Sequence, residues 1–312
     1  MVRRDAHNEG PVSAQFSLRP VTLDDAPALA SIRADHAREV GLTEENGERL
    51  MRHVLQLPGV DLGVDSMAAI IDGQIVGFNV FRHADEARLW GGVTAPFRRL
   101  GVGTALMAWG IGRARSVTDL DKVYAGTSSL RTDAHELYRR TGFVHARTFN
   151  AMVHTDPGSI PAPTWPPGTS WRNDLGDQAV TVATDVHNRG FVGHWDYRPM
   201  TKEAMGHTLN EPGAGPELSF VAYLDGLPIA FCLGRVAAPG GFINMLATDP
   251  AARGRGIGLA LLNQAMVEMA HRGARVIELN VDADNPTGAV RLYQRAGMTT
   301  TTSFEIFELD LR

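Results

Sequence analysis

A short run of arginine and glycine in this sequence suits the binding of a phosphate. It reads Arg253-Gly254-Arg255-Gly256-Ile257-Gly258, and it follows an apolar stretch at 242–247 and the turn Asp249-Pro250. A helical pattern starts near Ile257, so the run joins a strand to a helix and places unpaired backbone N–H groups at a helix N-terminus. Glycine lets the backbone adopt φ > 0 and lets a ligand approach the main chain closely. The two arginines add fixed positive charge.

The same pattern occurs a second time, at Arg98-Arg99-Leu100-Gly101-Val102-Gly103. The two copies lie 155 residues apart, and the same spacing relates Gly101 to Gly256, Tyr138 to Tyr293, and Gly142 to Gly297. Four landmarks at one spacing predict a duplicated domain. Neither copy has the lysine of the P-loop or the glycine order of the dinucleotide-binding fingerprint, so both of those phosphate motifs are excluded.

Tyr293 lies 35 residues beyond the second loop, in a helical pattern that ends at Gly297. Its spacing allows two interpretations. It is either an aromatic residue at the rim of the core, with its hydroxyl in water, or a general acid that protonates a leaving group. Periodicity alone favours the first.

The elements that must position these residues follow the same order in both halves. Each half is expected to contain a β-hairpin around an Asp-Gly pair, a strand that leads into the glycine loop, a helix, a further strand, a short helix and a closing strand. One predicted helix starts at 22–25. The others span 44–57, 103–114, 134–140, 177–192, 201–209, 257–273 and 287–296. The predicted strands are 16–19, 67–71, 75–80, 88–93, 122–125, 149–154, 170–172, 220–224, 228–233, 242–247, 276–281 and 304–309.

Five prolines between residues 156 and 168 mark the boundary between the halves, since proline fixes φ and removes a hydrogen-bond donor. We therefore predict a flexible tail at 1–15, an N-terminal domain at 16–155, a Pro-rich linker at 156–169 and a C-terminal domain at 170–312. A length of 312 residues agrees with two domains.

Composition excludes several classes of protein. The formal net charge of −5 argues against a nucleic-acid partner. No signal peptide and no apolar run of 18 residues is visible, so we expect no membrane span and a cytoplasmic protein. The single cysteine, Cys232, lies in an apolar strand-like run and fits a small buried hydrophobe better than a nucleophile. We expect no metal site.

Leu246-Ala247-Thr248-Asp249-Pro250, the loop that follows, Asn285 and Leu292-Tyr293 together resemble the GNAT superfamily of acyl-CoA-dependent N-acetyltransferases. The resemblance occurs once per half, as in tandem two-domain members of the mycothiol synthase type. It implies an α+β, three-layer fold with two GNAT-like domains, each a mixed, splayed β-sheet flanked by helices. It also implies acetyl-CoA as cosubstrate, with the pantetheine arm lying between parted strands.

The resemblance implies a role for each matching residue. The backbone of Leu246, Ala247 and Thr248 would face the thioester and pantetheine, and Asn285 would contact the CoA arm. Tyr293 would protonate the departing thiolate. The pyrophosphate would be held by Arg253, Gly254, Arg255, Gly256, Ile257, Gly258 and Leu259. The corresponding cofactor residues of the N-terminal copy are Val93, Arg98, Arg99, Leu100, Gly101, Val102, Gly103 and Thr104.

Two positions depart from the family pattern. Many relatives carry a glutamate before the loop as general base, whereas this chain has Asn244 there, which cannot usefully accept a proton. The base is therefore open between His194, Asp196, Glu203 and direct loss of a proton from the amine to water. In the N-terminal copy Leu130 replaces the asparagine found at 285. That half either binds acyl-CoA and catalyses poorly or serves mainly as a scaffold, so we expect catalysis in the C-terminal half.

Residues 188–199 mix aromatic side chains with histidine, aspartate and arginine. They lie where the family places its acceptor-binding helices, and they suit either a polar small acceptor or packing between the domains. We expect direct transfer of acetyl to the primary amine of a small molecule, without a covalent enzyme intermediate. Acetylation of a protein or peptide amine, or a non-catalytic acyl-CoA sensor, are the alternatives. The chain is expected to be a monomer or a homodimer.

Overall fold

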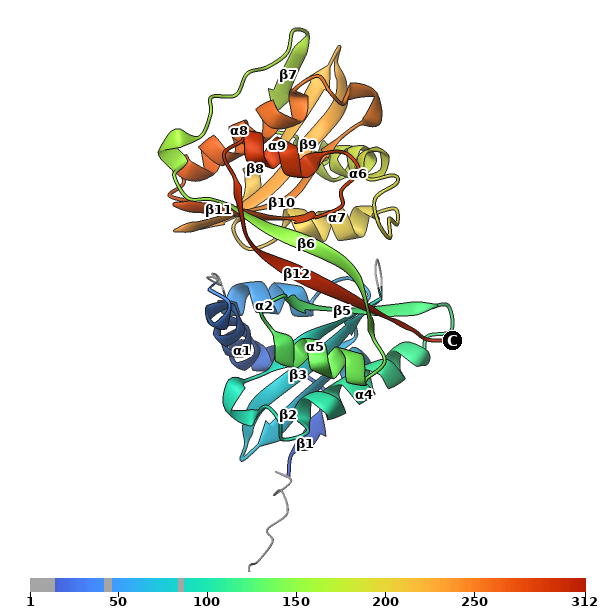
Figure 1. Ribbon diagram of the computed structural model, residues 1–312. Coiled ribbons are helices and arrows are strands. Elements are labelled where there is room, and N and C mark those ends of the chain that lie inside the picture. Colours follow the sequence, from blue (N-terminus) through green and yellow to red (C-terminus); the bar gives the residue numbers. More distant parts are fainter. Residues whose placement is uncertain (1–14, 42–46, 84–86) are drawn as a thin grey trace, which may run out of the picture.

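The computed structural model describes residues 15–41, 47–83 and 87–312 (Figure 1). Apart from Gln15, the predicted tail at 1–15 lies outside the described residues, as does the start of the predicted helix at 44–57. None of the described helices is long and apolar enough to cross a bilayer.

Each half follows the predicted order of elements, with an unpredicted short helix at 62–65 in the N-terminal half. Most strands extend beyond the predicted bounds, whereas the helices of the C-terminal half lie within them. The N-terminal half contains β1 (Ser17–Arg19), α1 (Ala26–Glu39), α2 (Gly47–Leu55), α3 (Leu62–Asp65), β2 (Ser66–Ile71), β3 (Gln74–Arg82), β4 (Arg88–Val93), α4 (Val102–Arg115), β5 (Lys122–Ser128), α5 (Thr132–Arg140) and β6 (Val144–His154). The C-terminal half contains β7 (Thr169–Arg172), α6 (Ala179–Gly190), α7 (Lys202–Leu209), β8 (Ala214–Leu224), β9 (Leu227–Ala237), β10 (Gly240–Thr248), α8 (Ile257–His271), β11 (Val276–Asp282), α9 (Ala289–Arg295) and β12 (Thr299–Asp310).

Both hairpins turn at the predicted Asp-Gly pairs. The φ angles are 49° and 77° at Asp72 and Gly73, and 50° and 81° at Asp225 and Gly226. Positive φ at both central residues defines the type I′ turn, whose twist matches that of the flanking strands. Local chemistry therefore fixes the register of β2 with β3 and of β8 with β9.

The strands of both halves form one continuous sheet, in the order β1-β2-β3-β4-β5-β12-β6-β11-β10-β9-β8-β7. The two closing strands are exchanged between the halves. β12, the last strand of the chain, pairs with β5 of the N-terminal half, and β6 pairs with β11 of the C-terminal half. Figure 1 shows β6 and β12 running side by side between the two halves. The sequence pattern predicted both closing strands but not this exchange.

The sheet is splayed in each half. β4 and β5 pair in parallel only at Arg88 and Leu89, and β10 and β11 pair in parallel only at residues 240–242. All other strand pairs in the sheet are antiparallel. Beyond the short parallel contacts the strands separate and open a gap in each half. The predicted fold class, a mixed and splayed sheet flanked by helices, is confirmed.

Helices cover both faces of the sheet, because alternate residues of the central strands point to opposite sides. In the C-terminal half Phe220 belongs to a core built with α8, whereas Val221 and Phe231 belong to a core built with α6 and α7. In the N-terminal half α4 packs on one face, and α1 and α2 pack on the other. The helix that follows each glycine loop is thus fixed by burial of its apolar side.

The proline-rich stretch connects the halves along the surface of the C-terminal core. It contains a short 3-10 turn at Pro157–Ser159, and Ile160 and Trp165 pack against the core of α8 and its strands. The division of the chain at 156–169 remains a prediction, since β6 and β12 each join the sheet of the other half.

The strand exchange predicts which half loses stability when β12 is weakened. Phe307 lies on β12, is 1% exposed and packs in a core with Val123 and Ala125 of β5. We expect Phe307→Ala to lower the free energy of unfolding by about 3–5 kcal/mol, measured by urea denaturation. Amide hydrogen exchange should rise in peptides from β4 and β5.

The control for this experiment is Leu227→Ala, because Leu227 is 67% exposed at a hairpin turn. That change should alter the free energy of unfolding by no more than about 0.5 kcal/mol. Faster exchange confined to β8–β11 in the Phe307→Ala variant would contradict the exchanged pairing.

Candidate active site

A cavity of about 440 Å³ lies where β10 and β11 separate. All but one of the predicted cofactor residues of the C-terminal half line it. These are Leu246, Ala247, Thr248, Arg253, Gly254, Gly256, Ile257, Gly258, Leu259 and Asn285, and Tyr293 joins them. The exception is Arg255, which is exposed on the loop and does not line the cavity. Splaying therefore places the strand, the glycine loop and the tyrosine around one space.

The glycine loop ends in the same conformation in both halves. Gly256 caps α8 with a φ of 85°, and Gly101 caps α4 with a φ of 87°. Neither helix has a side-chain cap, and the first helical bond of α8 runs from Ala260 N–H to the carbonyl of Gly256 (3.0 Å). The earlier N–H groups of this turn are therefore available to an anion.

Arg253 has a different environment from the one that its loop position suggests. Its Nε donates to the carbonyl of Thr248 (3.2 Å), and its Nη2 donates to the carbonyl of Gly190 on α6 (2.5 Å). Arg98 likewise donates from Nε to the carbonyl of Val93 (3.0 Å). The loop arginine thus ties the end of the splayed strand to its neighbours. In the C-terminal cavity Arg291 and Arg295 of α9 add exposed positive charge, which no motif in the sequence marks.

Asn285 forms the turn that leads toward α9. Its Oδ1 accepts hydrogen bonds from the backbone N–H of Thr287 (2.8 Å) and from the Thr287 hydroxyl (2.6 Å). The two bonds fix the amide through its oxygen, and Asn285 lines the cavity. Leu130, at the corresponding place in the other half, is 60% exposed and offers no donor.

The two matched tyrosines differ in their hydrogen bonding. The Tyr138 hydroxyl donates to the carbonyl of Gly126 (3.2 Å). The Tyr293 hydroxyl has no hydrogen-bond partner among the described residues, although Tyr293 is only 8% exposed. Burial raises the pKa of Tyr293 well above its ordinary value, and Cys232 raises it further. Tyr293 is therefore a protonated donor that faces the cavity.

Of the three candidate bases, only His194 lines the C-terminal cavity; Asp196 and Glu203 do not. Burial lowers the pKa of His194, Arg253 and His187 lower it further, and Asp282 offsets part of the effect. The imidazole is therefore neutral at pH 7 and able to accept a proton.

Asn244 occupies a β-bulge, since the register of β10 against β9 shifts between Ile243 and Met245. Its Nδ2 donates to the Glu211 carboxylate (2.6 Å), which also pairs with Arg235 at 3.3 Å. Glu211 was not singled out in the sequence, because it lies between elements without a motif. Its carboxylate does not line the cavity.

The exchanged strand β6 completes the wall of the C-terminal cavity. Phe149 of β6 lines it, and so does Asp282 at the end of β11. Arg147 of β6 holds the Asp282 carboxylate by two bonds of 2.8 Å each. The N-terminal cavity is completed in the same way by Phe304 of β12. The 155-residue spacing relates Phe149 to Phe304, so the signal was present in the sequence but unused.

A second cavity, of about 480 Å³, lies between β4 and β5. Of the predicted N-terminal cofactor residues, it is lined by Val93, Arg98, Arg99, Gly101, Gly103 and Thr104. Leu100 and Val102 do not line it. Val102 is instead 1% exposed in the core of α4, since the first turn of that helix alternates between the cavity and the sheet.

The N-terminal cavity differs from its counterpart at the end nearest α1. His36 donates from Nε2 to the carbonyl of Val93 (2.9 Å), and its ring lies against Gly92. Arg98 pairs with Glu39, and Arg131 pairs with Asp133. Acidic side chains of α1 and α5 thus pair with both arginines at this end of the cavity. No cluster of three or more His, Cys, Asp or Glu side chains suited to a metal occurs in the described residues.

The Acetyltransferase (GNAT) family model matches this chain twice, at residues 34–143 and 183–298. Among curated relatives, the mycothiol acetyltransferase of Geodermatophilus obscurus is 30% identical over 296 residues, covering 88% of this chain and 90% of the relative. That of Kineococcus radiotolerans is 31% identical over 284 residues, covering 88% of each chain.

Solved structures show the same architecture. A GCN5-related N-acetyltransferase from Sphaerobacter thermophilus superimposes with a TM-score of 0.78 at 27% identity, over 97% of both chains. A tandem GNAT protein from the clavulanic acid biosynthesis pathway gives a TM-score of 0.71 at 15% identity, over 96% of this chain and 99% of the other. With two splayed cavities, two family matches and full-length relatives, this chain belongs to the GNAT acetyltransferase family in its tandem two-domain form.

Proposed function

We propose that the C-terminal cavity transfers acetyl from acetyl-CoA to the primary amine of a small molecule. The observation that carries this proposal is the Tyr293 hydroxyl, which faces the cavity and has no hydrogen-bond partner in the described parts of the chain, whereas the Tyr138 hydroxyl donates to a carbonyl. A donor kept protonated by burial suits a leaving thiolate. The N-terminal cavity holds a second acyl-CoA and contributes little chemistry.

In the proposed reaction the amine nitrogen attacks the thioester carbonyl carbon. A C–N bond forms, and the carbonyl oxygen becomes an oxyanion that backbone N–H groups of β10 stabilise where this strand has parted from β11, beyond the paired residues 240–242. His194 accepts the proton that the nitrogen loses. The C–S bond then breaks, Tyr293 donates to the departing sulfur, and both side chains return to their starting states by exchange with water.

The relatives and the walls of the cavity support the proposed acceptor class. Relatives named mycothiol acetyltransferase match over most of both chains, which supports a small-molecule acceptor. Gly190, Phe191 and His194 line the cavity from α6 and the loop after it, and Phe149 lines it from β6. A screen that reads CoA release should therefore find small primary amines ahead of peptides; faster release with peptide substrates would favour a protein acceptor.

The loop assignment predicts separate effects of two matched variants. Gly256→Glu and Gly101→Glu each force a side chain into a left-handed conformation and place a carboxylate at the anion site. Titration calorimetry with acetyl-CoA should show two sites in the wild type and one in each variant. Only Gly256→Glu should abolish activity, and retention of activity in that variant would contradict the assignment.

The role of Tyr293 predicts unequal effects of two phenylalanine substitutions. Tyr293→Phe removes the proton donor and should lower kcat by about 10²–10⁴-fold, whereas Tyr138→Phe removes only a bond to Gly126 and should leave kcat within about twofold. Steady-state kinetics with one active acceptor measures both. The reverse order would place catalysis in the N-terminal half.

The role of His194 predicts the pH dependence of kcat. Because its pKa is lowered, the imidazole is neutral above pH 6.5, and kcat should fall only as the pH drops below that lowered pKa. His194→Gln should lower kcat at pH 7.5 by about 10²-fold or more and abolish the fall of kcat at low pH. Asp196→Asn should retain that fall. An unchanged fall of kcat at low pH in His194→Gln would eliminate His194 as the base.

A further inference from the structure

The segment after α6 forms a loop with a sharp tip. Asn188 ties its base, since Nδ2 donates to the carbonyl of Met200 (3.0 Å) and Oδ1 accepts from the backbone N–H of Met200 (2.8 Å). At the tip, Gly193 and Asp196 both have positive φ, of 84° and 48°. The backbone turns sharply at Gly193 and Asp196, and His194 and Trp195 lie between them.

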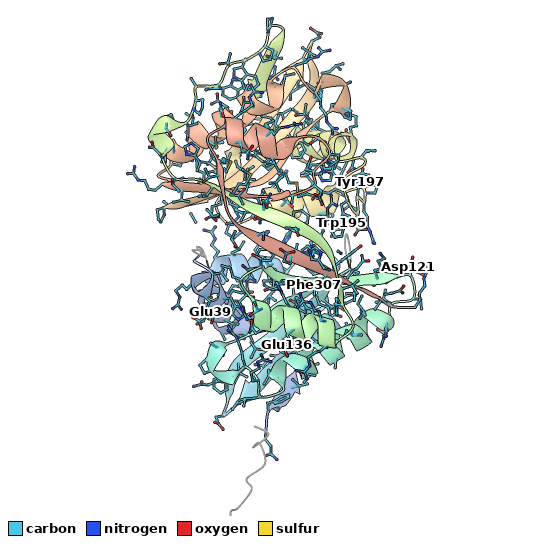
Figure 2. The ribbon with its side chains drawn as sticks, in the orientation of Figure 1. Glu39, Asp121, Glu136, Trp195, Tyr197 and Phe307 are labelled. Atoms are coloured by element: carbon cyan, nitrogen blue, oxygen red, sulfur yellow. The ribbon has the colours of Figure 1, made fainter. Side chains whose placement is uncertain are left out.

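Neighbouring side chains at this tip contact different halves of the molecule. His194 lines the C-terminal cavity and lies against Phe191, with ring centroids 4.8 Å apart. The Trp195 ring makes edge-to-face contacts with two aromatic residues from the N-terminal half. The ring centroids are 5.2 Å apart for Tyr124 of β5 and 6.2 Å apart for Phe149 of β6. Figure 2 shows Trp195 on the side of the C-terminal half that faces the exchanged strands.

A further contact links the same region to the N-terminal half. On α7, His207 stacks on His53 of α2 with ring centroids 3.7 Å apart, and its Nε2 donates to the His53 carbonyl (3.1 Å). The loop and the helix after it therefore rest on the other half at several points.

We propose that Trp195 is a positioning residue, which Tyr124 and Phe149 hold in place so that the adjacent His194 stays inside the C-terminal cavity. The inference rests on the proposed function, in which His194 is the base. It assigns the N-terminal half a second task besides holding a cofactor, since two of its strands supply the surface against which the acceptor loop of the other half is fixed.

The physical reason is that His194 has little else to fix it. Its backbone N–H donates to the carbonyl of Phe191 (3.0 Å) and its carbonyl accepts from the N–H of Tyr197 (3.2 Å). Its ring lies against Phe191 alone, and no hydrogen bond of the ring occurs among the described residues. One residue away, a tryptophan in contact with two buried or half-buried rings gives the tip a rigid anchor, because edge-to-face aromatic contacts add about 0.5–1.5 kcal/mol each beyond burial.

The test uses two variants of Trp195 in the full-length chain. Trp195→Leu removes the aromatic anchor, and Trp195→Phe retains an aromatic ring. The pKa of His194 is measured by NMR titration of its ring C–H signals, assigned by their loss in His194→Gln. The charged and titratable groups that face it are Arg253, Asp282 and His187, and neither Trp195 variant alters them.

In the wild type we expect His194 to titrate below 6.5. In Trp195→Leu the imidazole should become hydrated, so its pKa should rise toward 6.5, and Trp195→Phe should keep it low. With an active acceptor, kcat of Trp195→Leu should fall on the order of 10- to 100-fold, while the acetyl-CoA Kd stays within about twofold. Trp171→Leu is the control, since Trp171 is 37% exposed on the edge strand β7. It should leave the His194 pKa, kcat and the acetyl-CoA Kd unchanged.

An unchanged His194 pKa in Trp195→Leu would overturn the proposal, and so would an equal rise in Trp195→Phe. A raised pKa without a loss of kcat would leave the positioning role standing and would show instead that His194 is not the base. Tyr124→Phe, which keeps the ring beneath Trp195, should behave as the wild type in both measurements; a raised His194 pKa there would also count against the aromatic anchor.

Discussion

The hydrogen bonding between β6 and β12 is the interaction on which the rest of this molecule depends. The two strands pair along nine residue positions and join the sheets of the two halves into one. Each half also takes its last strand from the other. The core around β5 is therefore closed by Phe307 of β12, and β11 is paired along its length with β6.

This exchange makes both cavities composite. The splay between parallel strands opens each one, and a phenylalanine from the exchanged strand forms part of its wall. The two cavities have nevertheless become different at the places where chemistry would occur. The C-terminal cavity has a tyrosine hydroxyl that bonds to none of the residues described by the structure, and a histidine on a loop. The N-terminal cavity has its tyrosine bonded to a carbonyl and a histidine bonded to the strand end.

Much of this arrangement could be predicted from the sequence, because it is encoded by local patterns. The Asp-Gly turns, the glycine caps at 101 and 256, and the strand-to-helix order follow from backbone preferences that a few residues determine. The repeat then relates each residue of one site to its counterpart. The location of Tyr293 beside the glycine loop follows from that order of elements.

The exchange could not be predicted in the same way. β6 and β12 have equivalent positions in the repeat, so each fits either sheet, and periodicity does not say which neighbour it will choose. The position of His194 depends on the path of an irregular loop and on Trp195 meeting a ring from the other half. His36 and Phe191 share the 155-residue spacing, but a change of residue type hides such a pair until the structure shows both beside a splayed strand.

The pairing of Phe149 with Phe304 in the β6–β12 ladder has a further meaning. These two residues are counterparts in the duplication. The neighbouring pairs, Thr148 with Glu305 and Asn150 with Ser303, are counterparts of each other at the same 155-residue spacing. A pseudo-twofold axis therefore passes through this rung. A substitution far from the axis changes one site alone and can specialise it. A substitution at the Phe149–Phe304 pair alters the walls of both cavities at once. Divergence of the two sites is therefore easiest at their outer ends and most constrained at the centre of the molecule.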